Sequence, residues 1–273
     1  MSFRCKRIVS AVAGFGLVAG SLLLAADEPS FTEQQKIEFM EKAQVVKSHQ
    51  TSKGVTSPWK LTLSDGTVTH DALFQPVEES APTKQFADGH TEINFKDKWQ
   101  YNIAGYRVAK MIGLDDMVPV YTSRKWDGKD GSVSWWVPNV MFDEGDRLKR
   151  SEHPPDMDSW NHQMYDLRIL TALFYDMDPN LTNVLIDKDW KIWRIDFTRA
   201  FREFKDLPAK KDLAMCRKDV YPKLKQLNYD DVLSATQPYL AKGEVKALIA
   251  RRDKIVQIFD QLISKNGESS VLF

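Results

Sequence analysis

The spacing of apolar residues divides the chain into a strand-rich first half and a helix-rich second half. Apolar and polar positions alternate from Trp59 to Leu63 and from Thr67 to Phe74, around a short Asp-Gly turn, which predicts a β-hairpin. Two more alternating runs lie between Pro119 and Trp136. Between these pairs of strands, apolar residues recur at helical spacing from Tyr101 to Met111, and Gly113 is expected to end that helix.

Longer helical patterns dominate the second half. One apolar face runs from Trp160 to Phe174 and another from Val245 to Ile263, and both predict helices. Between them, Val184 to Ile186 and Trp190 to Ile195 read as two short strands joined by a turn. The order of elements predicts an α+β fold, with an antiparallel sheet and one main helix first and a mainly helical part second.

Other segments show no such periodicity. Residues 78–91 carry Pro, Gly and charge, and are expected to form a loop. A basic stretch with prolines, Arg147 to Pro155, precedes the long helices and marks the expected lobe boundary. The predicted organisation is therefore a signal peptide or N-terminal anchor (1–26), a lead-in segment (27–52), a first lobe (53–143) and a second lobe (144–273).

The N-terminus has the pattern of an export signal. Arg4, Lys6 and Arg7 precede an uncharged run from Ile8 to Ala26. Cleavage after this run is expected, and the alternative is an uncleaved segment that anchors the protein to the membrane. Either way the body of the protein is expected to be exported, to a periplasmic or extracellular location. Cys216 is then the one cysteine of the mature chain, and we expect a buried thiol without a disulfide.

Overall charge excludes some classes of partner. The 273 residues include 38 Lys and Arg against 38 Asp and Glu, so the formal net charge is zero. A protein held to nucleic acid by bulk positive charge is therefore not expected. Contact with a membrane is expected only if the N-terminal segment is retained. A local site must carry the function.

Three side chains between residues 173 and 202 suggest such a site. Asp178 lies five residues before Asn183 at the mouth of the second predicted hairpin, and Asp196 ends the returning strand. Two carboxylates and one amide oxygen are therefore expected to converge. Phosphoryl transfer uses such a set, because one carboxylate accepts a hydroxyl proton while the other carboxylate and the amide hold Mg²⁺.

These residues resemble the protein-kinase-like superfamily, in which Asp, four residues and Asn precede a strand that ends in a metal-binding Asp. The chain is most similar to the atypical branches (HipA-like, phosphatidylinositol-kinase-like and secretory-pathway kinases), and closest to uncharacterised exported bacterial members. The similar runs are 113–119 and 195–201. The resemblance implies a two-lobed kinase-like fold and Mg²⁺ or Mn²⁺ with ATP. It also implies that Asp178 is the catalytic base and that Asn183 and Asp196 are metal ligands.

The same resemblance places a nucleotide site in the first lobe. Gly54 would lie in the turn that covers the nucleotide. Gln75 occupies the position of the family's phosphate-holding lysine, and Asn102 that of the glutamate which pairs with it. A charge-assisted hydrogen bond contributes about 1.5–3 kcal/mol, so its loss is expected to lower the rate of phosphoryl transfer by roughly ten- to a hundredfold. The candidates for a replacement cation are Lys53, Lys60, Lys84 and Lys96.

Two functions follow from this pattern. The first is an exported phosphotransferase that moves the γ-phosphate of Mg-ATP to an unknown hydroxyl acceptor. The alternative is a pseudokinase, which binds nucleotide, metal or a partner without catalysis, because both members of the ion pair are neutral amides. Fold resemblance alone does not separate the two.

Two residue patterns keep other interpretations open. The acidic run from Asp176 to Asp187 matches ligand positions of a calcium-binding EF-hand loop, although Leu181 stands where that loop needs glycine. Arg199 is expected to pair with a carboxylate, and the alternative is that it clamps phosphate.

Overall fold

The computed structural model describes residues 31–51, 58–178, 180–208 and 212–273. Residues 32–273 form one compact unit, and the features below belong to it. The predicted signal or anchor segment (1–26) and Gly54 lie outside the described residues. No helix in the described part of the chain combines the length and apolar character needed to cross a membrane.

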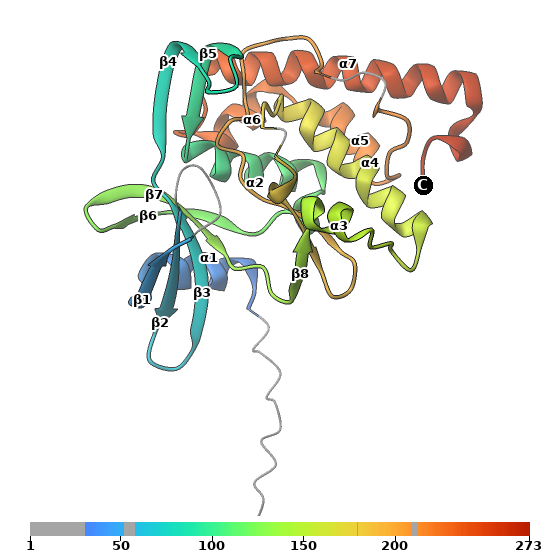
Figure 1. The fold of residues 1–273 in the computed structure, drawn as a ribbon. Coiled ribbons are helices and arrows are strands. Elements are labelled where there is room, and N and C mark those ends of the chain that lie inside the picture. The colour runs from blue at the N-terminus through green and yellow to red at the C-terminus, as the bar shows by residue number, and fades with distance from the viewer. Residues whose placement is uncertain (1–30, 52–57, 179, 209–211) are drawn as a thin grey trace, which may run out of the picture. The chain divides into compact units, whose positions relative to one another are not determined.

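An antiparallel five-stranded sheet forms the first lobe (Figure 1). The predicted hairpin is present, with Trp59 opposite Phe74 and Leu61 opposite Ala72. Leu61, Ala72 and Phe74 are wholly buried, which is why apolar residues alternate in these strands. The strands, in spatial order, are β1 (Gln44–Gln50), β2 (Trp59–Ser64), β3 (Thr69–Gln75), β7 (Lys129–Trp135) and β6 (Tyr121–Trp126).

One long helix, α2 (Gln100–Ile112), packs against β6 and β7 and carries the predicted apolar face. It ends where expected, at Gly113, whose φ of 78° lies in the left-handed region that glycine enters without strain. The Gly113 N–H bonds back to the last turn of the helix. Nine of its thirteen residues are buried, so this helix joins the sheet to the second lobe.

Residues 33–50 correct the prediction of a lead-in segment. They form α1 (Glu33–Lys42), which packs on β6, and the edge strand β1, which pairs with β2. Phe39 and Met40 of α1 are buried. The apolar patch was too short to predict this packing, and an edge strand that is mostly exposed has no apolar alternation to reveal it.

The predicted loop at 78–91 is instead most of a two-stranded ribbon. Strands β4 (Glu78–Gln85) and β5 (Thr91–Lys98) pair with each other in an antiparallel hairpin. β4 has no buried residue, and β5 buries only Glu92, Phe95 and Asp97. A ribbon this exposed lacks a hydrophobic face, so the periodicity that predicts strands was missing.

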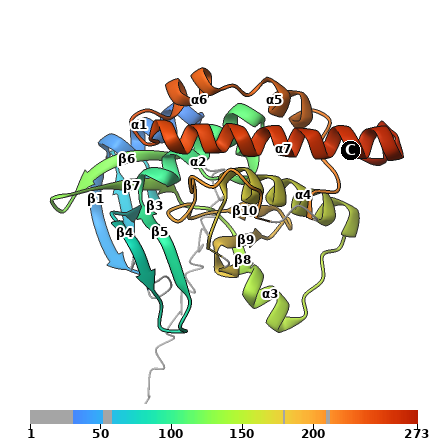
Figure 2. The ribbon, with the colours of Figure 1, turned by 90° about the horizontal axis from the view of Figure 1, so that it is seen from above.

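The second lobe is mainly helical. Figure 2 shows its longest helix, α7 (Lys242–Asn266), running along α5 (Val220–Gln226) and α6 (Tyr229–Thr236), and it also packs on α4 (Met157–Phe174). Single-turn 3₁₀ helices cover Asp115–Met117, Leu181–Asn183 and Glu268–Ser270. Cys216 is a buried free thiol, as predicted. The two-lobed α+β architecture expected from the sequence is therefore confirmed.

A small sheet adjoins the first lobe. Its strands are β8 (Val140–Asp143), β9 (Val184–Asp187) and β10 (Ile192–Arg194), in the order β10-β9-β8. The predicted β9–β10 hairpin is confirmed. Because β8 pairs with β9 and leads into α3 (Glu144–Arg150), it belongs with the second lobe, and the boundary falls a few residues before the predicted residue 144.

Candidate functional site

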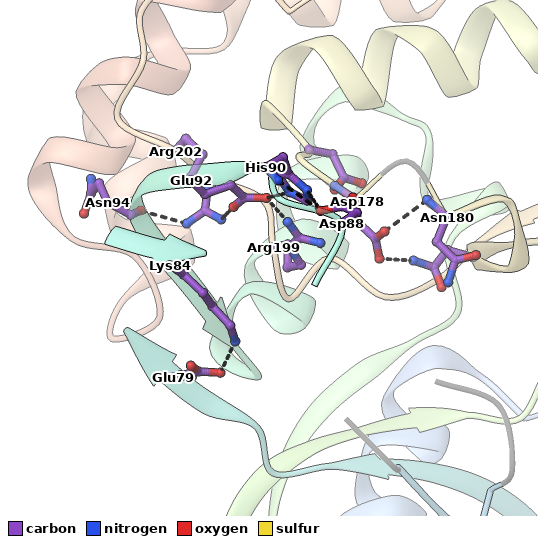
Figure 3. Close-up of polar contacts among 12 residues, drawn as sticks. Glu79, Lys84, Asp88, His90, Glu92, Asn94, Asp178, Asn180, Arg199 and Arg202 are labelled. Carbon is purple, nitrogen blue, oxygen red and sulfur yellow. Dashed lines mark hydrogen bonds and ion pairs between the residues drawn. The ribbon is translucent and has the colours of Figure 1, made fainter. Parts of the chain in front are cut away.

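A chain of short side-chain turns holds the loop that carries Asp178. α4 ends at Phe174, and then the Asp178 N–H donates to Asp176 Oδ1 (3.0 Å) and the Asn180 N–H donates to Asp178 Oδ1 (3.0 Å). The other carboxylate oxygen of Asp178 accepts a bond from Asn183 Nδ2 at 2.7 Å. Figure 3 shows Asp178 facing Asn180 across this loop. The predicted base and one predicted metal ligand are thus in direct contact.

Arg194 of β10 lies beneath this loop, and sequence reasoning missed it. It forms a buried ion pair with Asp176 and donates to the backbone carbonyls of Asn183 (3.0 Å) and Ile195 (2.6 Å). Burial acts to lower the pKa of Arg194, but the charges of Asp176, Asp196 and Asp178 raise it overall. One feature of the sequence could have revealed it: Arg194 is a charged residue at a position of the alternating strand that is expected to face inward.

Replacing Arg194 by methionine is expected to destabilise the fold strongly, because Asp176 would keep a buried charge without its partner. We expect the free energy of unfolding to fall by about 3–5 kcal/mol. Denaturant unfolding followed by circular dichroism measures this. The matched control is Lys254→Met, which removes an exposed pair with Asp206 and is expected to change little. Equal losses in both variants would contradict the assigned role of Arg194.

Asp196 follows β10, is partly buried, and has a left-handed backbone conformation with φ of 59°. Its Oδ1 accepts a bond from the Thr198 hydroxyl (2.8 Å) and its Oδ2 accepts one from Gln75 Nε2 (3.0 Å). Burial raises the pKa of Asp196, and these neutral donors offset only part of that effect. The Ile195 N–H bonds to the Asn183 carbonyl (3.0 Å), so the backbone just before Asp196 pairs with that of Asn183.

Gln75 and Asn102 form a continuous chain of amide hydrogen bonds at the same place. Asn102 Nδ2 donates to Gln75 Oε1 (2.8 Å) and to Ser132 Oγ (3.0 Å), while Asn102 Oδ1 accepts from the Phe197 N–H (2.7 Å). Both amides are buried. The two neutral amides are therefore hydrogen-bonded to each other, and Gln75 extends this chain of bonds to the Asp196 carboxylate.

A cavity of about 560 Å³ opens between the sheet of the first lobe and the β8–α3 and Asn183 regions of the second. Gln75, Asn183 and Asp196 all line it, and Asp143 and Asp146 add two more carboxylates. This volume lies within the range of about 300–1,000 Å³ usual for small-ligand sites. Among the described residues that line the cavity there is no Lys or Arg.

The candidate replacement lysines are engaged elsewhere. Lys60 pairs with Asp71 (2.7 Å) at the opposite end of β3 from Gln75, and Lys84 pairs with Glu79 (2.6 Å). Lys96 pairs with Glu244 of α7 (2.7 Å). Lys53 lies outside the described residues.

Arg199 pairs with a carboxylate, as expected. Figure 3 shows it facing Glu92 of β5, which also binds Arg202 at 3.0 Å. The calcium-loop alternative is wrong, because Val184–Asp187 is a strand and the Asp187 carboxylate caps its own turn through the Asp189 N–H (2.9 Å).

No group of three or more His, Cys, Asp and Glu side chains is placed to hold a metal ion within the described residues. The predicted metal site does not require three such side chains. Asn183 would supply an amide oxygen, and phosphate oxygens of the nucleotide complete sites of this kind. Buried carboxylate and amide oxygens are the donors that Mg²⁺ and Mn²⁺ prefer. The donor chemistry at Asp196 and Asn183 therefore fits a hard divalent cation.

No protein-family model matches this sequence, and no curated protein matches it. Solved structures do. Hydra Fam20 with sugar aligns with a TM-score of 0.64 and 14% identity, over 88% of this chain and 92% of that one. A Golgi casein kinase with Mn and ADP bound aligns with a TM-score of 0.63 and 15% identity, over 88% and 78%. The Helicobacter pylori proinflammatory kinase CtkA aligns with a TM-score of 0.52 and 9% identity, over 83% and 98%.

At these identities the likeness establishes the fold. It agrees with the antiparallel first lobe, the mainly helical second lobe and the cavity between them. The chain therefore has the two-lobed protein-kinase-like fold of the atypical kinases.

Proposed function

We propose that the protein is an ATP-dependent phosphotransferase whose nucleotide binds in the 560 Å³ cavity together with Mg²⁺ or Mn²⁺. The observation that carries the proposal is the convergence of Asp178, Asn183 and Asp196. The first two are hydrogen-bonded, and the Asn183 carbonyl accepts a backbone bond from Ile195, the residue before Asp196; Asn183 and Asp196 both line the cavity. Together these three side chains, from one loop and the hairpin that follows it, offer the donor types that phosphoryl transfer requires.

Each residue has a distinct role in this proposal. Asn183 and Asp196 hold the cation, which supplies the positive charge that the phosphates need. Asp178 accepts the proton of the acceptor hydroxyl, and its bond from Asn183 orients the carboxylate toward the acceptor. Gln75 and Asn102 fix the position of Asp196 through their hydrogen bonds.

The charge of the cavity supports a strict need for metal. Its described lining includes three carboxylates (Asp143, Asp146 and Asp196) and no Lys or Arg. A triphosphate placed beside Asp196 without a cation would be repelled, since like charges in a partly buried site interact strongly. The Golgi casein kinase was solved with Mn and ADP, and this is consistent with metal-assisted nucleotide binding here.

A pseudokinase is the second candidate, because the amides Gln75 and Asn102 replace a Lys–Glu pair and no other described lysine lines the cavity. It would use the same cavity for binding and lack turnover. The N-terminal pattern also supports export, in which case either activity would take place outside the cytoplasm.

Nucleotide binding is expected to depend entirely on divalent metal. In a thermal unfolding assay, Mn²⁺ with ATP at 100 times the dissociation constant should stabilise the protein by about 2.7 kcal/mol. ATP with EDTA should produce no shift. Transfer of labelled γ-phosphate then separates the two candidates. A shift with ATP in EDTA equal to that with Mn²⁺ would contradict the metal requirement. No shift under any condition would overturn the phosphotransferase and leave only a pseudokinase that binds a partner.

A further inference from the structure

A second carboxylate, Asp97, lies near enough to Asp196 for the two charges to interact. It is the seventh residue of β5, and only 8% of its surface is exposed. The next residue, Lys98, donates its N–H to the carbonyl of Thr198 at 2.8 Å. This bond joins the end of β5 to the segment that follows Asp196.

The hairpin is held firmly against this segment. Glu92 of β5 binds both Arg199 and Arg202, and Arg202 also donates to the Asn94 carbonyl at 3.0 Å (Figure 3). Glu92 and Arg202 are buried. Asp97 is therefore fixed close to Asp196 by contacts on both sides of it along β5.

The two carboxylates compete for one hydroxyl. The Thr198 hydroxyl donates to Asp196 Oδ1 at 2.8 Å, and the same side chain lies within hydrogen-bonding reach of Asp97. A hydroxyl has one proton and can satisfy only one of them. Asp97 Oδ1 is buried without a hydrogen-bond partner. In the described part of the chain, neither carboxylate forms an ion pair with a Lys or Arg.

We propose that Asp97 is a second carboxylate ligand, with Asp196, of the divalent cation that accompanies the nucleotide; this rests on the proposed function. Two neighbouring carboxylates that share no ion-pair partner repel each other, and a cation between them relieves that repulsion. In the kinase-like family the position of Asn102 in α2 is expected to hold a glutamate. Because Asn102 is neutral, Asp97 supplies the negative charge that is missing there. The ribbon β4–β5 then contributes to the site as well as covering the segment after Asp196.

The test measures Mn²⁺ binding to the full chain, first with Mn²⁺ alone and then with Mn²⁺ and ADP. The electron paramagnetic resonance signal of the free ion reports how much Mn²⁺ stays unbound. Loss of partners outside the ligand shell already lowers metal affinity about 10–100-fold. We therefore expect Asp97→Asn to weaken Mn²⁺ binding by about 100-fold or more. The matched control is Asp88→Asn, an exposed carboxylate of the same hairpin, which should bind Mn²⁺ like the wild type.

Thermal unfolding without metal separates a ligand from a structural residue. If Asp97 is a ligand, Asp97→Asn removes repulsion and leaves the metal-free melting temperature unchanged or higher, while the shift on adding Mn²⁺ is lost. A lower metal-free melting temperature with an intact Mn²⁺ shift overturns the proposal. Equal Mn²⁺-ADP binding by Asp97→Asn and wild type also overturns it and leaves the proposed function standing. Absence of Mn²⁺-ADP binding in the wild type overturns the proposed function itself.

Discussion

Replacing Asp196 by asparagine is expected to abolish metal-dependent nucleotide binding. The substitution preserves the size of the side chain and removes the charge that would hold the cation. The described cavity lining has no Lys or Arg to replace it. We expect the affinity for Mn-ADP to fall at least about 100-fold, or roughly 2.8 kcal/mol. Isothermal titration with Mn-ADP measures this directly.

The fold should survive that change. Burial raises the pKa of Asp196, so the charged form is disfavoured in the folded protein, and removing the charge should not lower the metal-free melting temperature. The control is Asp189→Asn, an exposed carboxylate in the β9–β10 turn. Metal binding should also weaken as pH falls, because a proton competes with the cation for a carboxylate of raised pKa. Full Mn-ADP affinity in Asp196→Asn would remove this residue from the metal site.

Replacing Asp178 by asparagine is expected to reduce turnover and leave nucleotide binding intact. A positioned general base contributes about 10²–10⁴-fold to rate, so kcat should fall by that amount. In the proposed roles Asn183 and Asp196 hold the cation and Asp178 acts only on the acceptor hydroxyl, so the affinity for Mn-ADP should stay at the wild-type value. Transfer of labelled γ-phosphate, compared with Mn-ADP titration, checks both parts.

The outcome of that experiment also decides between the two candidate functions. Wild-type turnover that is lost in Asp178→Asn supports the phosphotransferase. Wild-type binding of Mn-ADP without transfer to any hydroxyl acceptor supports the pseudokinase. Turnover that is unchanged in Asp178→Asn would show that another group accepts the proton.

Hydrophobic periodicity predicted those elements that have one buried face. The hairpin β2–β3, the helix α2 ending at Gly113 and the hairpin β9–β10 are all present. The ribbon β4–β5 and the edge strand β1 were missed, because strands exposed on both faces leave no alternating pattern. The predicted lead-in and loop are parts of the fold because each pairs with the next strand along the chain, β1 with β2 and β4 with β5.

Within the site, the sequence predicted residues that share a recognisable spacing. Asp178 and Asn183 are five residues apart in one loop, and Asp196 ends the next hairpin, so local structure alone brings them near each other. Their roles in binding and catalysis stay predictions. Arg194 and Asp97 were missed because each acts through a contact with a different part of the chain, with Asp176 for the first and the Thr198 segment for the second.

The sequence by itself determined the order of strands and helices, the acid–amide–acid pattern, and the neutral amides at positions 75 and 102. These depend on neighbouring residues and on local backbone preferences. Only the tertiary structure decided that Gln75 bonds Asp196, that Lys60, Lys84 and Lys96 are engaged by other carboxylates, and that Asp97 is buried near Asp196. The physical reason is that charge and hydrogen bonding act between side chains close in space, and the packing of the lobes sets those distances.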